Sequence, residues 1–163
     1  MSSKERTIPI DHAWIVAHIP HQGSMCLLDR VESWNETTIL CRAHNHLDTN
    51  NPLRAAGSLG IVNGIEYAAQ AMAVHGALLA NDDQTASAGF LTSVRNVRWH
   101  RQRLDDVDVE LMVHAERLPG NELNILYEFS LYCAETLLLS GRVSVMLNVN
   151  GRNTSYTNLD NPS

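Results

Sequence analysis

The chain has 163 residues, of which 44% are hydrophobic and 18% charged, which fits one folded domain and excludes disorder throughout. Acidic residues outnumber basic ones by 18 to 12, and the formal net charge of −6 is opposite in sign to that of most proteins that bind nucleic-acid phosphates. The one lysine, Lys4, lies in a polar N-terminal stretch, so Schiff-base and pyridoxal-phosphate chemistry have no plausible nucleophile. We expect no cofactor.

The cellular location is predicted from the absence of export and membrane signals. No run approaches the roughly 18–20 apolar residues that span a membrane, and residues 1–6 lack the apolar core of a signal peptide. Cys26, Cys41 and Cys133 are odd in number and lack C-x-x-C spacing, which indicates reduced thiols. We therefore expect a cytoplasmic protein with neither a nucleic-acid nor a membrane partner.

The first half of the chain begins with a short helix. Residues 10–18 suit one, with Asp11 as its N-cap, and it must end before Ile19-Pro20 because proline disfavours helix in the preceding residue. Residues 37–45 are predicted to form a strand.

A long helix is predicted over residues 59–80, which are rich in Ala, Met and Leu. Apolar or small residues occupy one face at helical spacing: Val62, Ile65, Ala69, Ala73, Gly76 and Ala77. The opposite face, with Tyr67, Ala71, Val74 and Leu78, is hardly more polar. A helix that is apolar nearly all round should be buried nearly all round.

The second half is predicted to be antiparallel sheet. Residues 86–101 form one strand, and alternating apolar residues over 107–113 and 123–131 predict two more, joined at Pro119-Gly120-Asn121 as a hairpin. Residues 137–149 predict a further strand with an irregularity near Gly141. The simplest architecture is an α+β domain in which an antiparallel sheet wraps one long central helix.

Glu66 is the only charged residue in the predicted long helix, and Gln70 lies one turn further on, within side-chain reach. A buried carboxylate should be hydrogen-bonded, shifted toward its protonated form, or both. A carboxyl group tuned in this way suits general acid–base catalysis. The alternative is a structural glutamate held by backbone amides or by a subunit interface.

Two motifs resemble those of a known family. The stretch I-P-H-Q-G-S-M-C-L-L-D-R-V at 19–31 is similar to the L-P-H-R-x-P-x-L-L-x-D-R-V opening of bacterial 3-hydroxyacyl-ACP dehydratases, which have the hotdog fold. The stretch G-I-E-Y-A-A-Q-A-M-A at 64–73 resembles their helix motif L-I-x-E-A-M-A-Q, and V-R-W-H-R at 97–101 resembles their A-R-F-K-R strand. The resemblance extends from about 19 to 149 and implies that Glu66 is the catalytic acid, with Gln70 as its orienting neighbour.

The family's catalytic histidine, in a G-H-F-P stretch, has no counterpart. Counting back from Glu66 reaches Pro52, within N-N-P-L-R. The pattern is instead similar to a divergent, dehydratase-like branch associated with aryl polyene biosynthesis. His21 is the first candidate for the missing imidazole and His46 the second, whereas His75 points to another helix face. For each of them, the alternative is a surface or core histidine without a catalytic role.

A basic stretch near residue 100 is a candidate site for an acidic partner or a phosphate group. The resemblance implies that this partner is acyl carrier protein with its phosphopantetheine arm. The members of the stretch are Arg95, Arg98, His100, Arg101 and Arg103. The alternative is a solvated strand whose arginines pair with Asp105, Asp106 and Asp108. The eight histidines lack metal-ligand spacing, so no metal site is expected.

The resemblance implies dehydration of 3-hydroxyacyl thioesters on acyl carrier protein to trans-2-enoyl thioesters, in fatty acid or polyene-type biosynthesis. Amides near Gly60 and Ile61, at the helix N-terminus, would polarise the thioester carbonyl, with Arg98 and Arg101 also in the substrate-binding set. The alternatives are an acyl-ACP or acyl-CoA thioesterase and a noncatalytic hotdog partner of another dehydratase. We expect an N-terminal segment over 1–18, a hotdog domain over 19–149 that forms a homodimer or heterodimer, and a flexible tail over 150–163.

Overall fold

The centre of the fold is a single long helix, α2 (Gly64–Leu79). The computed structural model describes residues 10–20, 23–80, 89–120 and 124–147. The helix begins after a 3-10 turn, η3 (Ile61–Asn63), so the predicted start at residue 59 is about one turn too early. Leu59 is instead bonded to residues 104–105: its carbonyl oxygen accepts from Leu104 N at 2.8 Å, and its amide donates to Asp105 Oδ1 at 3.1 Å.

One antiparallel sheet of six strands covers this helix. The strands are β1 (Arg30–Trp34), β2 (Thr38–Ala43), β3 (Gly89–Trp99), β4 (Leu111–Leu118), β5 (Asn124–Cys133) and β6 (Thr136–Leu147). They lie side by side in the order β1-β2-β4-β5-β6-β3. The third strand along the chain therefore forms one edge of the sheet.

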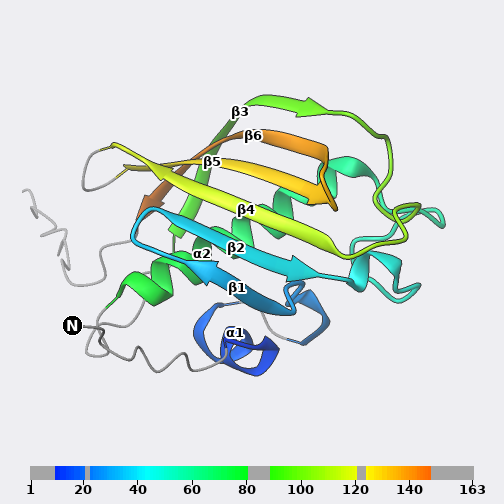
Figure 1. Ribbon diagram of the computed structural model, residues 1–163, viewed down its shortest axis with the longest axis horizontal. Helices are drawn as coiled ribbons and strands as arrows, with labels where there is room; N and C mark the ends of the chain where they lie inside the picture. The colour runs from blue at the N-terminus through cyan, green and yellow to red at the C-terminus, as the bar shows by residue number, and fades with distance from the viewer. Residues whose placement is uncertain (1–9, 21–22, 81–88, 121–123, 148–163) are drawn as a thin grey trace, which may run out of the picture.

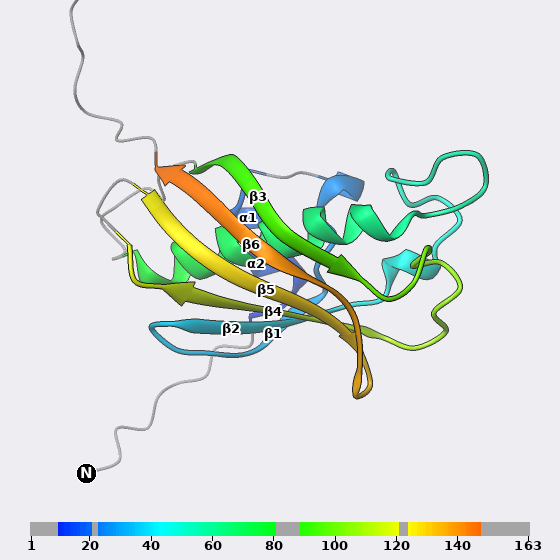
Figure 2. The ribbon, with the colours of Figure 1, turned by 90° about the horizontal axis from the view of Figure 1, so that it is seen from above.

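The sheet curves around α2, which lies along its inner face (Figures 1 and 2). The side of the helix that faces the sheet is buried, with Tyr67, Ala71 and Val74 inaccessible to solvent. The strands contribute buried side chains from alternate positions, among them Phe129 and Leu131 in β5, as the two-residue period of a strand requires. A sheet wrapped around one helix is the hotdog fold, which confirms the predicted α+β class.

The predicted hairpin is confirmed as β4 and β5, which pair from Leu111 with Cys133 to Leu118 with Leu126. The predicted strand start at residue 107 is wrong, since β4 begins at Leu111. Val107 is nevertheless buried, because its amide closes a turn by donating to Leu104 O at 3.1 Å. The alternating apolar residues therefore predicted burial at Val107, Leu111 and Val113 but not at Val109, which is 44% exposed, and they placed the strand boundary incorrectly. Strand β1 has no counterpart in the sequence predictions.

The irregularity predicted in the strand near Gly141 lies opposite this residue in the neighbouring strand β3, whereas β6 itself pairs regularly with β5 through Gly141. Arg95 pairs with Arg142 and Arg98 with Ser140, so three steps along β3 match two along β6, and β3 bulges there. Asn96, inside the bulge, has φ of 55°. A Cβ atom on residue 141 would lie 2.9 Å from two ring carbons of Phe129, which is the reason for a glycine at this position.

The N-terminal helix is also confirmed, as α1 (His12–His18). Asp11 caps it by accepting a bond from Trp14 N at 3.0 Å, and the chain becomes extended at Ile19. The predicted flexible tail at 150–163 lies outside the described residues. None of the described helices is long and apolar enough to cross a membrane.

Candidate functional site

One side of α2 is not covered by the sheet. Ile65, Ala69 and Ala73 are half-buried, and Val62, just before the helix, is 61% exposed. The expectation that the helix is buried nearly all round is therefore wrong for the chain by itself. A row of apolar and small residues along an open helix face marks a surface that another molecule can cover.

Glu66 lies on this open side, in the first turn of α2, and is half-buried. The full burial expected of it is not observed, because the sheet packs against the opposite side of the helix. The N-terminal end of a helix stabilises negative charge, so the position suits a carboxylate. Glu66 is thus the one acidic side chain of α2, accessible from the side that the sheet leaves open.

Gln70, one turn further on, is completely buried. Its Oε1 atom accepts a bond from Leu27 N at 2.8 Å, and its Nε2 atom donates to Met25 O at 2.7 Å. Both ends of the amide thus hold the backbone of residues 25–27 against α2. The opening motif and the helix motif, which lie more than forty residues apart, are joined by this one side chain.

Gly60 and Ile61 lie just before the helix, as the carbonyl-polarising role requires. The Ile61 amide, however, donates to Gln102 O at 2.9 Å. This N–H group already has an acceptor, so it would have to break that bond to serve a substrate. Gly60 has an extended backbone and pairs with Arg103 in an isolated bridge.

Two of the three candidate histidines are described by the structure, and His21 lies outside the described residues. His46 is completely buried in a 3-10 turn, η2 (Asn45–Leu47). Its Nε2 atom bonds to Val107 O at 2.9 Å, and its Nδ1 atom has no hydrogen-bond partner. Burial lowers the pKa of His46, so the ring stays neutral. The same burial keeps the ring out of reach of a substrate.

His75 is a structural histidine on the sheet side of α2. Its Nδ1 atom bonds to the Tyr127 hydroxyl at 2.7 Å and its Nε2 atom to Asn35 O at 2.8 Å. A carbonyl oxygen only accepts, so Nε2 carries the proton and Nδ1 accepts from the tyrosine. The ring is buried and lies away from the open side that carries Glu66, in agreement with the prediction.

The basic stretch divides into paired and unpaired arginines. Arg101 Nη2 lies 3.1 Å from Asp106 Oδ1, and Arg103 Nε lies 2.9 Å from Asp105 Oδ1. Arg95 and Arg98, both exposed on β3, make no ion pair with any described residue. The alternative, in which the arginines pair with nearby aspartates, therefore holds for Arg101 and Arg103, which follow the strand. It does not hold for Arg95 and Arg98, which lie within the strand.

A polar cluster around Tyr67, the residue that follows Glu66 in the chain, was missed in the sequence. The Tyr67 hydroxyl donates to Asn45 Oδ1 at 2.6 Å and accepts from Asn51 Nδ2 at 3.1 Å. Burial raises the pKa of Tyr67 to about 12, so the hydroxyl keeps its proton. This cluster fixes the loop that contains Pro52, where the family histidine would fall. No spacing rule links these three residues, which come from three separate segments.

The part of the chain that the structure describes contains no group of three or more His, Cys, Asp or Glu residues able to hold a metal ion. Asp29 and His44 form a hydrogen-bonded pair. The hydrogen bond that the His44 Nδ1–H group donates to the Asp29 carboxylate raises the pKa of His44.

A sheet wrapped around one helix, with a carboxylate in the helix's first turn, defines a protein of the hotdog class. Residues 14–155 match the family model described as ApeP-like, ApeP dehydratase. The chain belongs to this dehydratase family. A sequence comparison with curated proteins finds no significant match.

Solved structures agree on the fold. The chain is similar to the dehydratase heterocomplex ApeI:P from Xenorhabdus doucetiae, with 22% identity, 89% of this chain and 94% of that chain covered, and a TM-score of 0.73. A thioesterase from Haemophilus influenzae is 12% identical, with 85% of each chain covered and a TM-score of 0.58. A mutant thioesterase from Pseudomonas aeruginosa is also 12% identical, with 72% of this chain and 79% of that chain covered and a TM-score of 0.54.

Proposed function

We propose that this chain takes part in the dehydration of 3-hydroxyacyl thioesters carried on acyl carrier protein, giving trans-2-enoyl thioesters. The observation that carries the proposal is the position of Glu66, a half-buried carboxylate on the side of α2 that the sheet leaves open. The membership of the chain in a dehydratase family supports the reaction class. The pathway would be fatty acid or polyene-type biosynthesis.

The reaction needs one base and one acid. A base removes the proton from C2 of the substrate, the electrons form the C2–C3 double bond, and the C3–O bond breaks. The Glu66 carboxyl group donates a proton to the departing C3 hydroxyl, which leaves as water. A carboxyl group that moves this proton must be reachable from outside the fold, and the open side of α2 satisfies that requirement.

His21 is our candidate for the base. The structure holds Met25, four residues after His21, against Gln70, one helical turn after Glu66. This bond ties the segment that follows His21 to the helix that carries the acid. His46 is a weaker candidate because its ring is completely buried.

Assembly with a second hotdog subunit, identical or different, is part of the proposal. The edge strand β3 has β6 as its only neighbour in the described sheet, and an unpaired edge is a template for another strand. Trp99, at the end of this strand, is 59% exposed. The similar solved structure from Xenorhabdus doucetiae is a heterocomplex, which supports assembly with a second subunit.

Acyl carrier protein would dock where positive charge is available. Arg98 is exposed and has no carboxylate partner among the described residues, so it can attract an acidic protein surface. Arg101 is committed to Asp106 and would have to exchange that partner.

A noncatalytic role beside another dehydratase subunit is the second candidate function. The loop where the family histidine would fall holds Asn51, which is buried and bonded to the Tyr67 hydroxyl, and offers Pro52 in place of an imidazole. In that case the open side of α2 and the β3 edge would serve assembly alone.

The test is incubation of the purified protein with 3-hydroxyacyl-ACP and with acyl-ACP, following loss of water and release of free thiol by mass spectrometry. Glu66→Gln should abolish the enoyl product, whereas the control Glu135→Gln, at an exposed carboxylate in the β5–β6 turn, should retain it. Thiol release would indicate a thioesterase instead. If neither water loss nor thiol release is detected, and water loss appears only after a second dehydratase-like subunit is added, the result would indicate the noncatalytic role.

A further inference from the structure

The arginines of this acidic protein are distributed unevenly between carboxylate partners and open surface. Among the arginines that the structure describes, five form ion pairs with Asp or Glu: Arg30, Arg42, Arg54, Arg101 and Arg103. Arg95 in β3 and Arg142 in β6 make no ion pair with any described residue, and both are exposed. Their register in the sheet makes them direct cross-strand partners, so two like charges lie next to each other without a neutralising contact.

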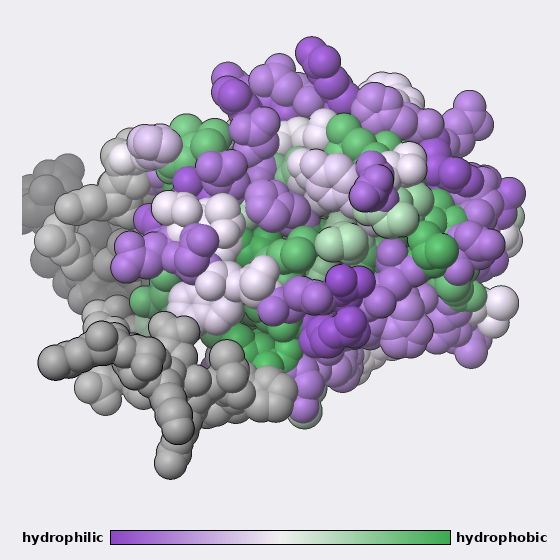
Figure 3. Space-filling view, viewed as in Figure 1, coloured by the Kyte–Doolittle hydropathy of each residue, from purple (hydrophilic) through white to green (hydrophobic). Residues whose placement is uncertain are grey.

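These two arginines line a pocket on the outer face of the sheet, with Ser93, Asn96, Leu126, Val143 and Ser144 as the other lining residues. The face is identified by alternation, because Tyr127 and Val143 are buried toward α2 while Leu126 and Arg142 are exposed. In Figure 3 this face is mainly hydrophilic. The pocket is therefore separate from the open side of α2 and from Glu66.

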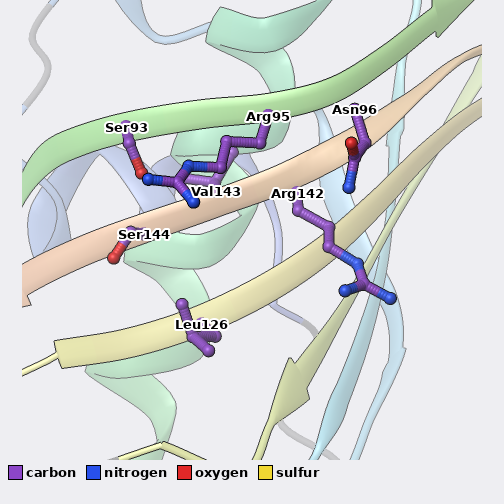
Figure 4. A pocket seen from close by; sticks show the side chains of 7 residues that line it. All are labelled: Ser93, Arg95, Asn96, Leu126, Arg142, Val143 and Ser144. Atoms are coloured by element: carbon purple, nitrogen blue, oxygen red, sulfur yellow. The ribbon is translucent and has the colours of Figure 1, made fainter.

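The lining offers hydrogen-bond donors and no carboxylate. The volume of the pocket is about 360 Å³, more than ten times the ~30 Å³ that one water molecule occupies in the liquid. In Figure 4 the Arg95 guanidinium lies beside Ser93, the Asn96 side chain hangs over β6, and Arg142 extends across β5. Ser93 and Ser144 are cross-strand partners, so their hydroxyls come from neighbouring strands at one end of the pocket.

The β3 bulge contributes to this arrangement. It falls between Arg95 and Arg98, and it places Asn96 in the left-handed region with φ of 55°. A bulge changes the direction of a side chain relative to a regular strand, and here the residue after Arg95 lines the pocket as well. The pocket thus gains an amide donor that strict alternation would send to the inner face.

We propose that this pocket is a binding site for a phosphate-type oxyanion, held by the Arg95 guanidinium group with the Ser93 and Ser144 hydroxyls. The Arg142 side chain, which extends across β5 and away from Arg95 in Figure 4, would turn toward the bound anion. Guanidinium groups present fixed pairs of N–H donors that match phosphate oxygens, and hydroxyls add donors without charge. A second subunit paired along the β3 edge would cover the edge of the strand and leave this face open. The proposal does not depend on the dehydratase reaction.

Glu128 is the acidic residue that opposes this site. It lies on β5 directly across from Arg142 and is exposed on the same face, although the two form no described ion pair. Its charge must weaken the attraction for an anion. Removing that charge should therefore tighten binding, which no purely structural role of the two arginines would predict.

The test is titration of the full-length protein with inorganic phosphate and, separately, with glycerol phosphate, followed by isothermal calorimetry or phosphorus NMR. Ionic strength is kept constant with sodium chloride, because salt screens unspecific attraction. We expect saturable binding that Arg95→Gln and Arg142→Gln each weaken about tenfold, the loss of one charged hydrogen-bond donor. Tighter binding of glycerol phosphate would identify a phosphate ester as the natural ligand, and tighter binding of inorganic phosphate the free ion.

Arg98→Gln is the matched control. It removes the same charge from the same strand, three residues from Arg95, and Arg98 does not line the pocket. It should change affinity less than about twofold, whereas Glu128→Gln should increase it. Equal weakening by all three arginine variants would show that only the overall positive charge matters, and it would contradict the proposed site. The absence of saturable binding for both probes would contradict it as well. Thermal unfolding of each variant verifies that it is folded.

Discussion

The side chain of Gln70 accepts a hydrogen bond from the backbone amide of Leu27 at 2.8 Å. Its amide nitrogen donates to the carbonyl of Met25 at 2.7 Å. One buried side chain thus satisfies a backbone donor and a backbone acceptor of residues 25–27, as a neighbouring strand would do. The bond also sets the distance between the opening motif and the helix that carries Glu66. Gln70 therefore acts in this chain as a positioning residue between two motifs.

Replacing Gln70 by leucine should destabilise the protein by about 2 kcal/mol, because a buried N–H donor and a carbonyl acceptor lose their partner. The measurement is the free energy of unfolding in urea. Gln102→Leu is the matched control, since this glutamine is exposed and its change should cost less than about 0.5 kcal/mol. Equal losses in the two variants would contradict the anchoring role.

Tyr67→Phe should destabilise the protein by about 1–2 kcal/mol. The change removes the hydroxyl that donates to Asn45 at 2.6 Å and accepts from Asn51 at 3.1 Å. The half-buried Asn45 side chain loses a donor, and the buried Asn51 amide keeps only its bond to Asn45 O at 3.0 Å. Tyr132→Phe, on a half-buried tyrosine of β5, is the control and should have a small effect. Because the cluster fixes the loop of Asn51, proteolysis of that loop should accelerate in Tyr67→Phe alone; unchanged stability and proteolysis would show that the cluster contributes nothing.

The sequence predicted correctly those elements whose residue pattern is typical of only one kind of secondary structure. The 59–80 stretch predicted a helix because helix-forming residues follow one another, and the β4–β5 hairpin was predicted because apolar alternation is interrupted by P-G-N. Val107 shows the limit: it is as apolar and as buried as a strand residue, yet a turn to Leu104 holds it. Burial pattern alone does not distinguish a strand from a buried turn.

The helical part of the candidate site could be proposed from the sequence, whereas the part that depends on tertiary contacts could not. Glu66 and Gln70 are four residues apart, so helical geometry already places them together. Tyr67, Asn45 and Asn51 meet only through the fold, and the unpaired state of Arg95 and Arg142 depends on which carboxylates the fold brings near the other arginines. The sequence contains the charges, but their pairing is a property of the three-dimensional structure.

Gly64 marks a close approach between α2 and the sheet. A Cβ atom there would lie 2.7 Å from Leu139 Cδ2 and 2.9 Å from Leu131 Cδ2, and both leucines are completely buried. Gly64→Ala should therefore cost about 1–3 kcal/mol through overpacking, measured as a shift in the urea midpoint. Gly60→Ala is the control, because its Cβ would meet only Asn63 Nδ2 at 3.7 Å. A stabilised Gly64→Ala would mean that helix propensity outweighs the packing at this position.

Stability should decrease as the pH falls below about 6.5. Burial lowers the pKa of both His75 and His46 from the ordinary value of 6.5, so below that value the unfolded chain binds more protons than the folded one. The free energy of unfolding then falls as pH falls, by at most about 1.4 kcal/mol per pH unit for each histidine. The two histidines no longer lower the free energy of unfolding once the pH is below their lowered pKa values in the folded state.

Urea unfolding at pH 7.5 and pH 5.5 measures the effect. His75→Gln and His46→Gln should each remove part of the difference between the two pH values, because each variant lacks one of the two groups that gain a proton on unfolding. The change in this difference, and not the loss of stability at one pH, is the diagnostic quantity, since His75→Gln also alters the bonds to Tyr127 and Asn35. If the wild type and both variants lose the same amount between pH 7.5 and 5.5, other groups cause the loss, and the two buried imidazoles do not determine the acid sensitivity of the fold.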